Sequence, residues 1–390
     1  MCSSDLGESV RLLNDALSAG LLPNSQSASP ALAKLVQQYR TEEGRIQPDR
    51  TVGSMTEWNE ARNERIGIRG SYTDLGDEVP RGGIRFLDRL QEGIPTQASG
   101  RLELAKAIAN DRNPLTARVF VNRVWQHLFG EGLVRTPDDF GHLGEAPSPP
   151  QLLDYLAARF IEEGWSLKRL VSLLVSSATW RQDSRPSEMA LNADAENRLW
   201  HHMPMRRLGA EAIRDSVLAV SGRLDPRLFG PPVNPYRTAQ DAAKRLFSGP
   251  LDGGGRRSLY VKMTMMEPPR FLALFNQPIP KVTTGRRDKT SVPDQALAML
   301  NDPFIVAMAR HWGGRAVHDG AASPEERARA MFAAAFGRPP AADEVDRLVA
   351  LARRAASLRG GNAETLLACT PAWNDVAHAL FNLKEFLYVP

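Results

Sequence analysis

The chain has 390 residues, of which 42% are hydrophobic and 24% are charged, and this composition is ordinary for a globular protein. A chain of this length buries a substantial core in one large or two medium domains. The formal net charge is +4, and arginines and carboxylates are mixed along the chain without a block of one sign. This pattern argues against a nucleic-acid-binding arm or a polybasic anchor, and no apolar run approaches the roughly 20 residues of a membrane-spanning helix.

Cysteine usage and motif searches exclude several chemistries. The two cysteines, Cys2 and Cys369, provide no disulfide framework, no cysteine zinc site and no Cys-x-x-Cys-His haem site. The zinc helix His-Glu-x-x-His, the Gly-x-Ser-x-Gly elbow and the phosphate-binding loops are also missing. The run Gly253–Gly255 lacks the Lys-Ser/Thr that follows a phosphate loop, so we expect a flexible loop there. The residues predict no metal site and no cofactor.

The first residues, Met1–Leu6, match the translation of a common sequencing adapter read from a GTG start. We therefore expect residues 1–6 to be an artefact and any export signal to lie upstream of them, where it cannot be observed. Residues 7–99 are interpreted as the loop-rich C-terminal tail of an upstream domain.

Within this tail, a polar loop is expected over 22–30 and a helix over 31–43, where Leu32, Leu35, Val36 and Tyr39 share one face. Residues 44–100 are rich in Gly, Pro and Arg. The segment 65–72 alternates like a short strand, and 75–83 has the composition of a turn.

From Gly100 onward the apolar residues recur at the helical period. The helix starting at Pro114 and ending at Gly130 has proline in its first turn and glycine past its end, the expected asymmetry. A nearly apolar segment over 167–180 is expected to be a core helix, and 258–262 a short strand after the long loop 225–257. Further helices are expected over 101–109, 152–164, 208–220, 295–300, 304–312, 324–336, 342–357 and from 373 to the C-terminus. The prediction is a mainly α, multi-helix globular domain with a few short strands and long Gly/Pro-rich loops.

Six segments carry a family resemblance in a fixed order: Asn113–Gly130, Gly132–Gly141, Glu163–Lys168, Arg206–Asp215, Arg256–Tyr260 and Pro293–Pro303. Through them, Arg101–Val389 resembles the planctomycete PSD-one type domain (domain of unknown function fifteen-fifty-three), which forms the C-terminal part of large exported planctomycete proteins. The segment Arg65–Pro80 is similar to the usual lead-in to that domain. We accordingly expect one helical domain over residues 100–390.

The resemblance implies a cell-envelope, periplasmic or extracellular protein with a cytochrome-C-like domain upstream. Haem c is then expected only on that upstream region, which would be a partner within the same protein, and the resemblance implies no established activity for residues 100–390. Two positions depart from the family pattern. Pro149 stands where histidine is usual, and Asn276 stands where aspartate is usual. If either were an obligatory catalytic residue, this chain would lack it.

The first candidate site groups two imidazoles and two carboxylates at a helix end and its following loop: His127, Asp138, Asp139 and His142. These residue types can bind a divalent metal or act as a general acid and base. In the structural alternative, which we favour, an aspartate caps a helix or pairs with Arg135, and His127 lies near a helix C-terminus that attracts cations.

The second candidate site consists of three arginine pairs near element ends: Arg206–Arg207, Arg256–Arg257 and Arg286–Arg287. Guanidinium groups bind carboxylate or sulfate bidentately, so two converging pairs would form a site for an acidic or sulfated glycan. In the alternative, slightly favoured, the arginines tie down long loops through four carboxylates: Glu211, Asp215, Asp288 and Asp294.

Other polar and aromatic residues are expected to be structural. The set Trp125, Trp165, Trp180, Trp200 and Tyr260 can stack on a sugar ring, but at helical spacing with apolar neighbours such residues more often form a core. The side chains of His201 and His202 are expected to diverge, because neighbours point apart on a helix or strand, which makes them poor metal ligands. The methionines of the run Met263–Met266 are expected to fill gaps in the core.

Two functions remain open at this point. The first is a non-catalytic module, serving as a scaffold or binding a ligand such as a polysaccharide. The alternative is a hydrolytic or redox-linked enzyme that uses a pocket of His127, Asp138, Asp139 and arginines. Convergence of His127, Asp138, His142 and an arginine pair in one concave pocket would favour the enzyme, and their separation into ion pairs and caps would favour the module.

Overall fold

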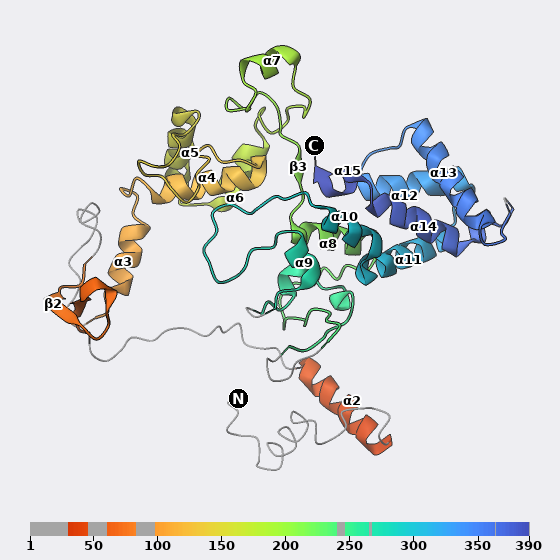
Figure 1. Cartoon of the computed structure of the whole chain (residues 1–390), viewed down its shortest axis with the longest axis horizontal. Helices are drawn as coiled ribbons and strands as arrows, with labels where there is room; N and C mark the ends of the chain where they lie inside the picture. The colour runs from red at the N-terminus through yellow and green to blue at the C-terminus, as the bar shows by residue number, and fades with distance from the viewer. Residues whose placement is uncertain are drawn as a thin grey trace. The chain divides into compact units, whose positions relative to one another are not determined.

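The computed structural model describes residues 30–45, 61–82, 98–239, 246–264, 267–362 and 364–389 (Figure 1). Helices dominate these residues, and their regular strands form only two short pairs, so the predicted mainly α class is confirmed. No helix within them is long and apolar enough to cross a membrane. The adapter-like residues 1–6 and most of the expected loop 22–30 lie outside the described residues.

The chain divides into two compact units, Met1–Glu57 and Trp58–Pro390. The structure describes helix α2 (Pro30–Arg45) of the first unit, and this confirms the helix expected over 31–43.

The second unit begins with a hairpin of β1 (Glu64–Gly67) and β2 (Leu75–Val79), which pair antiparallel. The chain reverses through the 3-10 helix η1 (Ile68–Gly70), where Arg69 and Gly70 both have positive φ. The strand expected over 65–72 is therefore right only at its start, and the turn expected over 75–83 is wrong. The left-handed backbone at Arg69 and Gly70 brings the reversal forward and leaves the later segment extended.

A smaller helical core follows the hairpin. After helix α3 (Arg101–Ile108), the helices that supply this core are α4 (Thr116–Phe129), α5 (Pro150–Glu162) and α6 (Leu167–Val175). The apolar face of α4 is buried against α5, because Val121, Trp125 and Phe129 recur at helical spacing and contact the same cluster as Leu153 and Phe160. The rings of Trp125 and Phe129 stack with their centroids 4.0 Å apart. Trp125 and Trp200 are buried and Trp165 and Trp180 pack on the cluster, so the core interpretation of these four tryptophans is confirmed.

The core helix expected over 167–180 is shorter and more one-sided than predicted. Helix α6 ends at Val175 and buries only Leu170 and Leu174, while Leu167 and Leu173 are exposed. The helix ends in a serine turn in which the hydroxyl of Ser177 donates to the carbonyl of Leu174. Local side-chain bonding to the backbone competes here with continuation of the helix.

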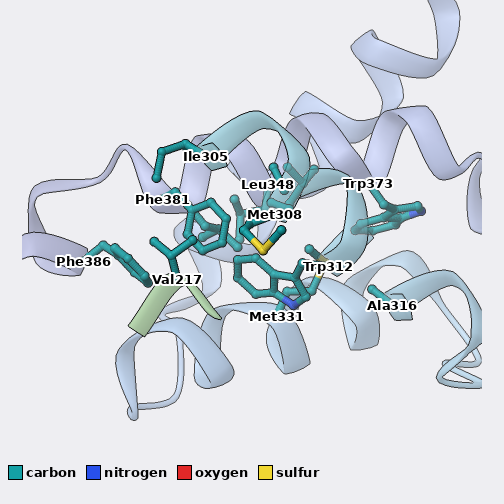
Figure 2. Close-up of a cluster of buried hydrophobic side chains, with 14 of the residues drawn as sticks. Val217, Ile305, Met308, Trp312, Ala316, Met331, Leu348, Trp373, Phe381 and Phe386 are labelled. Atoms are coloured by element: carbon teal, nitrogen blue, oxygen red, sulfur yellow. The ribbon is translucent and has the colours of Figure 1, made fainter. Parts of the chain in front are cut away.

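A larger core is formed by eight further helices of the described residues. They are α8 (Ala210–Val220), α9 (Arg270–Leu274), α10 (Pro293–Asn301), α11 (Pro303–His318), α12 (Pro324–Phe336), α13 (Ala342–Ser357), α14 (Thr370–Phe381) and α15 (Lys384–Leu387). Helices α11 to α14 pack on one another and appear in blue in Figure 1. Figure 2 shows Met308 and Trp312 of α11 together in the cluster, which also contains Trp373 and Phe381. All four side chains are at most 2% exposed.

The helix expected from 373 to the C-terminus is interrupted. Helix α14 ends at Phe381, and after α15 the chain forms β4 (Tyr388–Val389), which pairs antiparallel with β3 (Arg206–Arg207). The amide of Leu208 extends the pairing by donating to the carbonyl of Leu387. The end of the described chain thus fixes the position of the Arg206–Arg207 pair.

Several shorter elements complete the described chain. They are α7 (Glu188–Ala193), η3 (Gly253–Gly255), η4 (Ser258–Tyr260) and η5 (Leu366–Ala368). The strand expected over 258–262 is wrong, because both the amide and the hydroxyl of Ser258 donate to Asp215, at 2.7 Å each. That carboxylate satisfies the backbone where a strand would need a partner.

The flexible loop expected at Gly253–Gly255 is also wrong. Gly253 and Gly255 are buried, and all three glycines have positive φ. A Cβ atom at Gly255 would lie 2.2 Å from the carbonyl oxygen of Arg223. Glycine is required here for close backbone approach, and the turn is tightly packed.

Candidate basic surface site

Strand β3 places two arginines where the smaller and larger cores meet. Arg206 donates from Nη1 to the carbonyl oxygen of His127, in the last turn of α4, at 2.7 Å. Arg207 donates to the side-chain oxygens of Asn276 and Gln295, at 2.8 Å each, in the larger core. Within the described chain neither guanidinium forms an ion pair with a carboxylate. Both are held by neutral acceptors and keep their full charge.

The loop 276–292 brings further cations over the end of α4. Arg286 pairs with Glu131 at 2.9 Å, and Arg287 pairs with Glu211 of α8 at 2.7 Å. Lys289 donates to the carbonyl oxygen of Gly130 at 3.3 Å. Contacts from Lys289 and Arg206 to the end of α4 also follow the helix dipole, which favours cations at a C-terminus.

Asp138 connects this loop to α4. Its Oδ2 accepts the amide of Gly285 at 2.9 Å, and its Oδ1 lies 3.6 Å from Nη2 of Arg123 on α4. A Cβ atom at Gly285 would lie 2.1 Å from the same carboxylate, so the loop and Asp138 approach closely because residue 285 is glycine.

We call the following six residues the basic cluster: Arg123, Arg206, Arg207, Arg286, Arg287 and Lys289. Their carboxylate neighbours are Glu131, Asp138 and Glu211. The six cations outnumber these three carboxylates and Asp288 of the same loop, so the cluster keeps a surplus of positive charge.

Burial first, and the nearby cations second, lower the pKa of two groups at this surface. The pKa of Lys289 is lowered first by loss of water around its ammonium group, and the positive charges of Arg286, Arg206 and Arg207 lower it further against the opposing effect of Glu131. The pKa of His127 is also lowered, by loss of water and then by Arg287 and Arg123. Both groups thus lie among cations that the local carboxylates do not fully neutralise.

The four residues of the first candidate site are not all brought together. His127 and Asp138 both border the basic cluster, through Arg287 and Arg123. Asp139 instead accepts the amide of Gly141 at 2.8 Å within its own loop. His142 is exposed and forms no hydrogen bond or ion pair with the other three among the described residues. The part of the chain that the structure describes holds no group of three or more His, Cys, Asp or Glu residues placed for a metal ion.

The arginine pairs divide between two places. Arg206–Arg207 and Arg286–Arg287 enter the basic cluster, whereas Arg256 stacks on the ring of Tyr260, 4.0 Å from its centroid, and Arg257 lies 3.6 Å from Asp215. Glu211 and Asp215 occupy successive turns of α8, and they hold Arg287 and Arg257 respectively. The loop-tying interpretation therefore describes Arg257 and Arg287, while Asp288 and Asp294 form no ion pair with any of these arginines in the described chain.

Asn276 and Pro149 are the two departures from the family pattern, and each has a structural role. The Oδ1 atom of Asn276 accepts from Arg207, from Thr290 and, at 3.4 Å, from Gln295. Every contact of this atom is with a donor, so an aspartate oxygen would satisfy the same partners. Pro149 is the N-cap residue of α5.

Sequence reasoning missed Arg123, Lys289 and Glu131 as members of this surface. The only local signal was the run Gly285–Lys289, which contains three cations in five residues. The contribution of Arg123 had no such signal, because it depends on how loop 276–292 lies over α4.

The described surface contains a shallow depression of about 570 Å³ lined by Lys106, Asp111 and Trp165 among others. The basic cluster lies outside it. The cluster is an open surface whose arginine side chains Arg123, Arg286 and Arg287 are between 44% and 51% exposed.

The adjacent histidines His201 and His202 do not diverge as expected. Their Nδ1 atoms lie 3.1 Å apart and their ring centroids 4.5 Å apart. They occupy neither a helix nor a strand, and Trp200 just before them has a φ of 57°. The pKa of His202 is lowered by burial and by the neighbouring His201.

Comparison with known protein families identifies the family of this chain. The family model described as "PSD1: Protein of unknown function (DUF1553)" matches residues 100–352. The match covers more than half of the chain, and the protein belongs to this family. No curated protein and no solved structure matches it.

Proposed function

We propose that this domain is a non-catalytic binding module that holds an acidic or sulfated polysaccharide on the basic cluster. The observation that carries the proposal is the excess of cations over carboxylates where loop 276–292 covers the end of α4. A bound polyanion would offset that excess, and guanidinium groups bind carboxylate and sulfate with two parallel hydrogen bonds.

The existing ion pairs do not oppose such binding strongly. Arg286 and Arg287 are about half exposed in their pairs with Glu131 and Glu211. Exposed pairs of this kind contribute about 0–1 kcal/mol each, so a ligand oxygen can replace or join the carboxylate at small cost. Arg206 is held by a neutral carbonyl, which leaves its charge available to a nearby anion, whereas the guanidinium of Arg207 already donates to four neutral acceptors.

An extended ligand fits this surface better than a small molecule does. The cations belong to α4, β3 and loop 276–292 and are spread over an open surface, whereas small-molecule sites are usually concave and largely apolar. In the proposal, the module belongs to an exported cell-envelope protein whose upstream cytochrome-C-like domain carries haem c. Those features rest on the family resemblance.

The test is binding of the full chain to immobilised heparin, polygalacturonate and neutral dextran. The double variant Arg286→Ala/Arg287→Ala is compared with Arg347→Ala/Arg353→Ala, which removes the same charge from two α13 arginines in exposed ion pairs. We expect at least one polyanion to bind, and the cluster variant to lose at least tenfold in affinity while the control keeps it. Added salt should weaken binding, because contacts between exposed charges are screened. Equal losses in both variants, or no binding to either polyanion, would overturn the proposal.

One observation favours the second candidate, a hydrolytic or redox-linked enzyme. Burial and the charges of Arg287 and Arg123 lower the pKa of His127, which favours its neutral form, and these guanidinium groups would hold an anionic substrate. A neutral imidazole is suited to act as a general base. Release of reducing ends from polygalacturonate, abolished by His127→Gln with binding unchanged, would establish this function in place of the binding module.

A further inference from the structure

The loop between α7 and β3 holds two histidines in a rigid setting. The carboxylate of Asp194 accepts the amides of Arg198 and Leu199 at 2.9 and 2.7 Å. The side chain of Asn197 accepts the amide of His201 and donates to the carbonyl of His202, at 2.9 Å each. The backbone at both histidines is thus fixed by side chains of the same loop.

The protonation of His201 follows from its outer contact. Its Nε2 lies 3.0 Å from the carbonyl oxygen of Asp194, and a carbonyl oxygen only accepts, so this nitrogen carries the proton. In the neutral ring, Nδ1 of His201 therefore holds a lone pair, and it faces Nδ1 of His202 at 3.1 Å. A histidine whose outer nitrogen donates to a backbone carbonyl has the orientation typical of a metal ligand.

We propose that Nδ1 of His201 and Nδ1 of His202 together bind a divalent transition metal ion of the Cu(II), Ni(II) or Zn(II) class. Metal–imidazole bonds are about 2.0–2.1 Å long, so two nitrogens 3.1 Å apart subtend about 100° at a shared ion. That angle lies between the values for square-planar or octahedral and for tetrahedral coordination. Imidazole nitrogen suits all three metals, and Cu(II) binds such sites most strongly.

Without metal, the same two nitrogen atoms form a hydrogen bond. His202 then donates from Nδ1 to Nδ1 of His201 in a neutral hydrogen bond, which contributes little net stability and which a metal ion can therefore replace. Metal binding moves this proton to Nε2 of His202, and both rings remain neutral. Because the described residues supply no group of three ligating side chains, water or an added ligand completes the coordination. We therefore expect micromolar rather than tighter affinity.

The test is titration of the untagged full chain, in a Cys2→Ser background that removes a competing terminal thiol, with Cu(II) in a non-coordinating buffer. We expect one site of micromolar affinity per chain, with electron paramagnetic resonance showing splitting from two nitrogen donors. His201→Ala and His202→Ala should each weaken binding at least tenfold and remove the two-nitrogen pattern. His311→Ala and His318→Ala, which change exposed histidines of α11, should leave both readouts unchanged.

A variant that keeps the fold protects this test. His201→Gln retains an amide donor toward the carbonyl of Asp194 but offers no imidazole, and circular dichroism verifies its folding. Loss of the site in folded His201→Gln supports the chelate. Binding that persists in both His201→Ala and His202→Ala, or no specific Cu(II) site at micromolar concentration, would show that the pair is a hydrogen bond only. The polysaccharide assays use other residues, so either proposal can fail without the other.

Discussion

Arginine contributes to this protein in two ways that differ in burial. Arg214 is 7% exposed and donates to the carbonyl oxygens of Asp252 and Arg256, while Arg327 is 3% exposed and lies 5.1 Å from the ring centroid of Trp373. Arg327 donates to the carbonyl oxygens of Leu367 and Val317, so both arginines pair with backbone carbonyls, and their burial keeps their charge from a ligand. The arginines of the basic cluster are more exposed, which is why the proposed ligand site lies among them.

The carboxylate of Glu344, on helix α13, makes the stability of the protein depend on pH. Hydrogen bonds from Arg338 and the amide of Ala341 lower the pKa of Glu344 to about 2, below its ordinary value of 4.5. Because the folded-state pKa is depressed, this contribution is fully present above pH 4.5 and is lost as the pH falls toward 2. Glu344→Gln should therefore flatten the pH dependence of the free energy of unfolding between pH 4.5 and 2. Urea unfolding at several pH values measures the slope, and an unchanged slope would contradict the assignment.

Packing between helices decides which small residues can be replaced. Helices α11 and α14 approach closely at Gly313, where a Cβ atom would lie 2.5 Å from the backbone nitrogen of Asn374. At the neighbouring Gly314, the nearest atom is the Cγ2 of Thr370 at 4.0 Å. Two adjacent glycines of one helix therefore have opposite environments.

We expect Gly313→Ala to lower the free energy of unfolding by about 1–3 kcal/mol, because the backbone of α14 must move away. Gly314→Ala serves as the matched control. It should raise stability by about 0.5–1 kcal/mol, since alanine reduces the entropy that glycine loses in a helix. Thermal and urea unfolding of the two variants measure the difference, and equal effects would show that α11 and α14 are less closely packed than the structure indicates.

The ends of helices and strands could be predicted from sequence patterns only where they depend on nearby residues. Helices with a clear apolar face, such as α4 and α13, were predicted with nearly correct ends, because their periodicity and capping residues are local. The strand expected over 258–262 and the long C-terminal helix were wrong for non-local reasons. Asp215 captures the backbone of Ser258, and β3 pairs with the last residues of the described chain, from far away in the sequence.

At the scale of the whole molecule, the described residues contain two separate apolar cores. The smaller includes Trp125 and Phe129, and the larger includes Trp312 and Phe381. The contacts around the basic cluster that join them are polar, such as Arg206 with His127 and Arg286 with Glu131. Polar, partly exposed contacts couple two cores weakly.

The two cores should therefore unfold in separable transitions. Phe129→Ala should destabilise the smaller core, and Trp312→Ala the larger, each by about 3–5 kcal/mol. In differential scanning calorimetry, each variant should shift one transition and leave the other nearly in place. A single transition that both variants shift equally would show that the cores fold as one cooperative unit.

The sequence by itself determined the helical class, the family and the abundance of arginine. Apolar periodicity, composition and motifs in a fixed order can all be found in the chain without its tertiary structure. It also identified His127, Asp138 and all three arginine pairs as candidates, without showing which of them adjoin. Only the tertiary structure decided which cations gather, because Arg123, Arg206 and Lys289 meet through a loop packed over a helix end. It likewise turned His201 and His202 toward each other, because Asp194 and Asn197 hold the backbone in a conformation that no periodic pattern encodes.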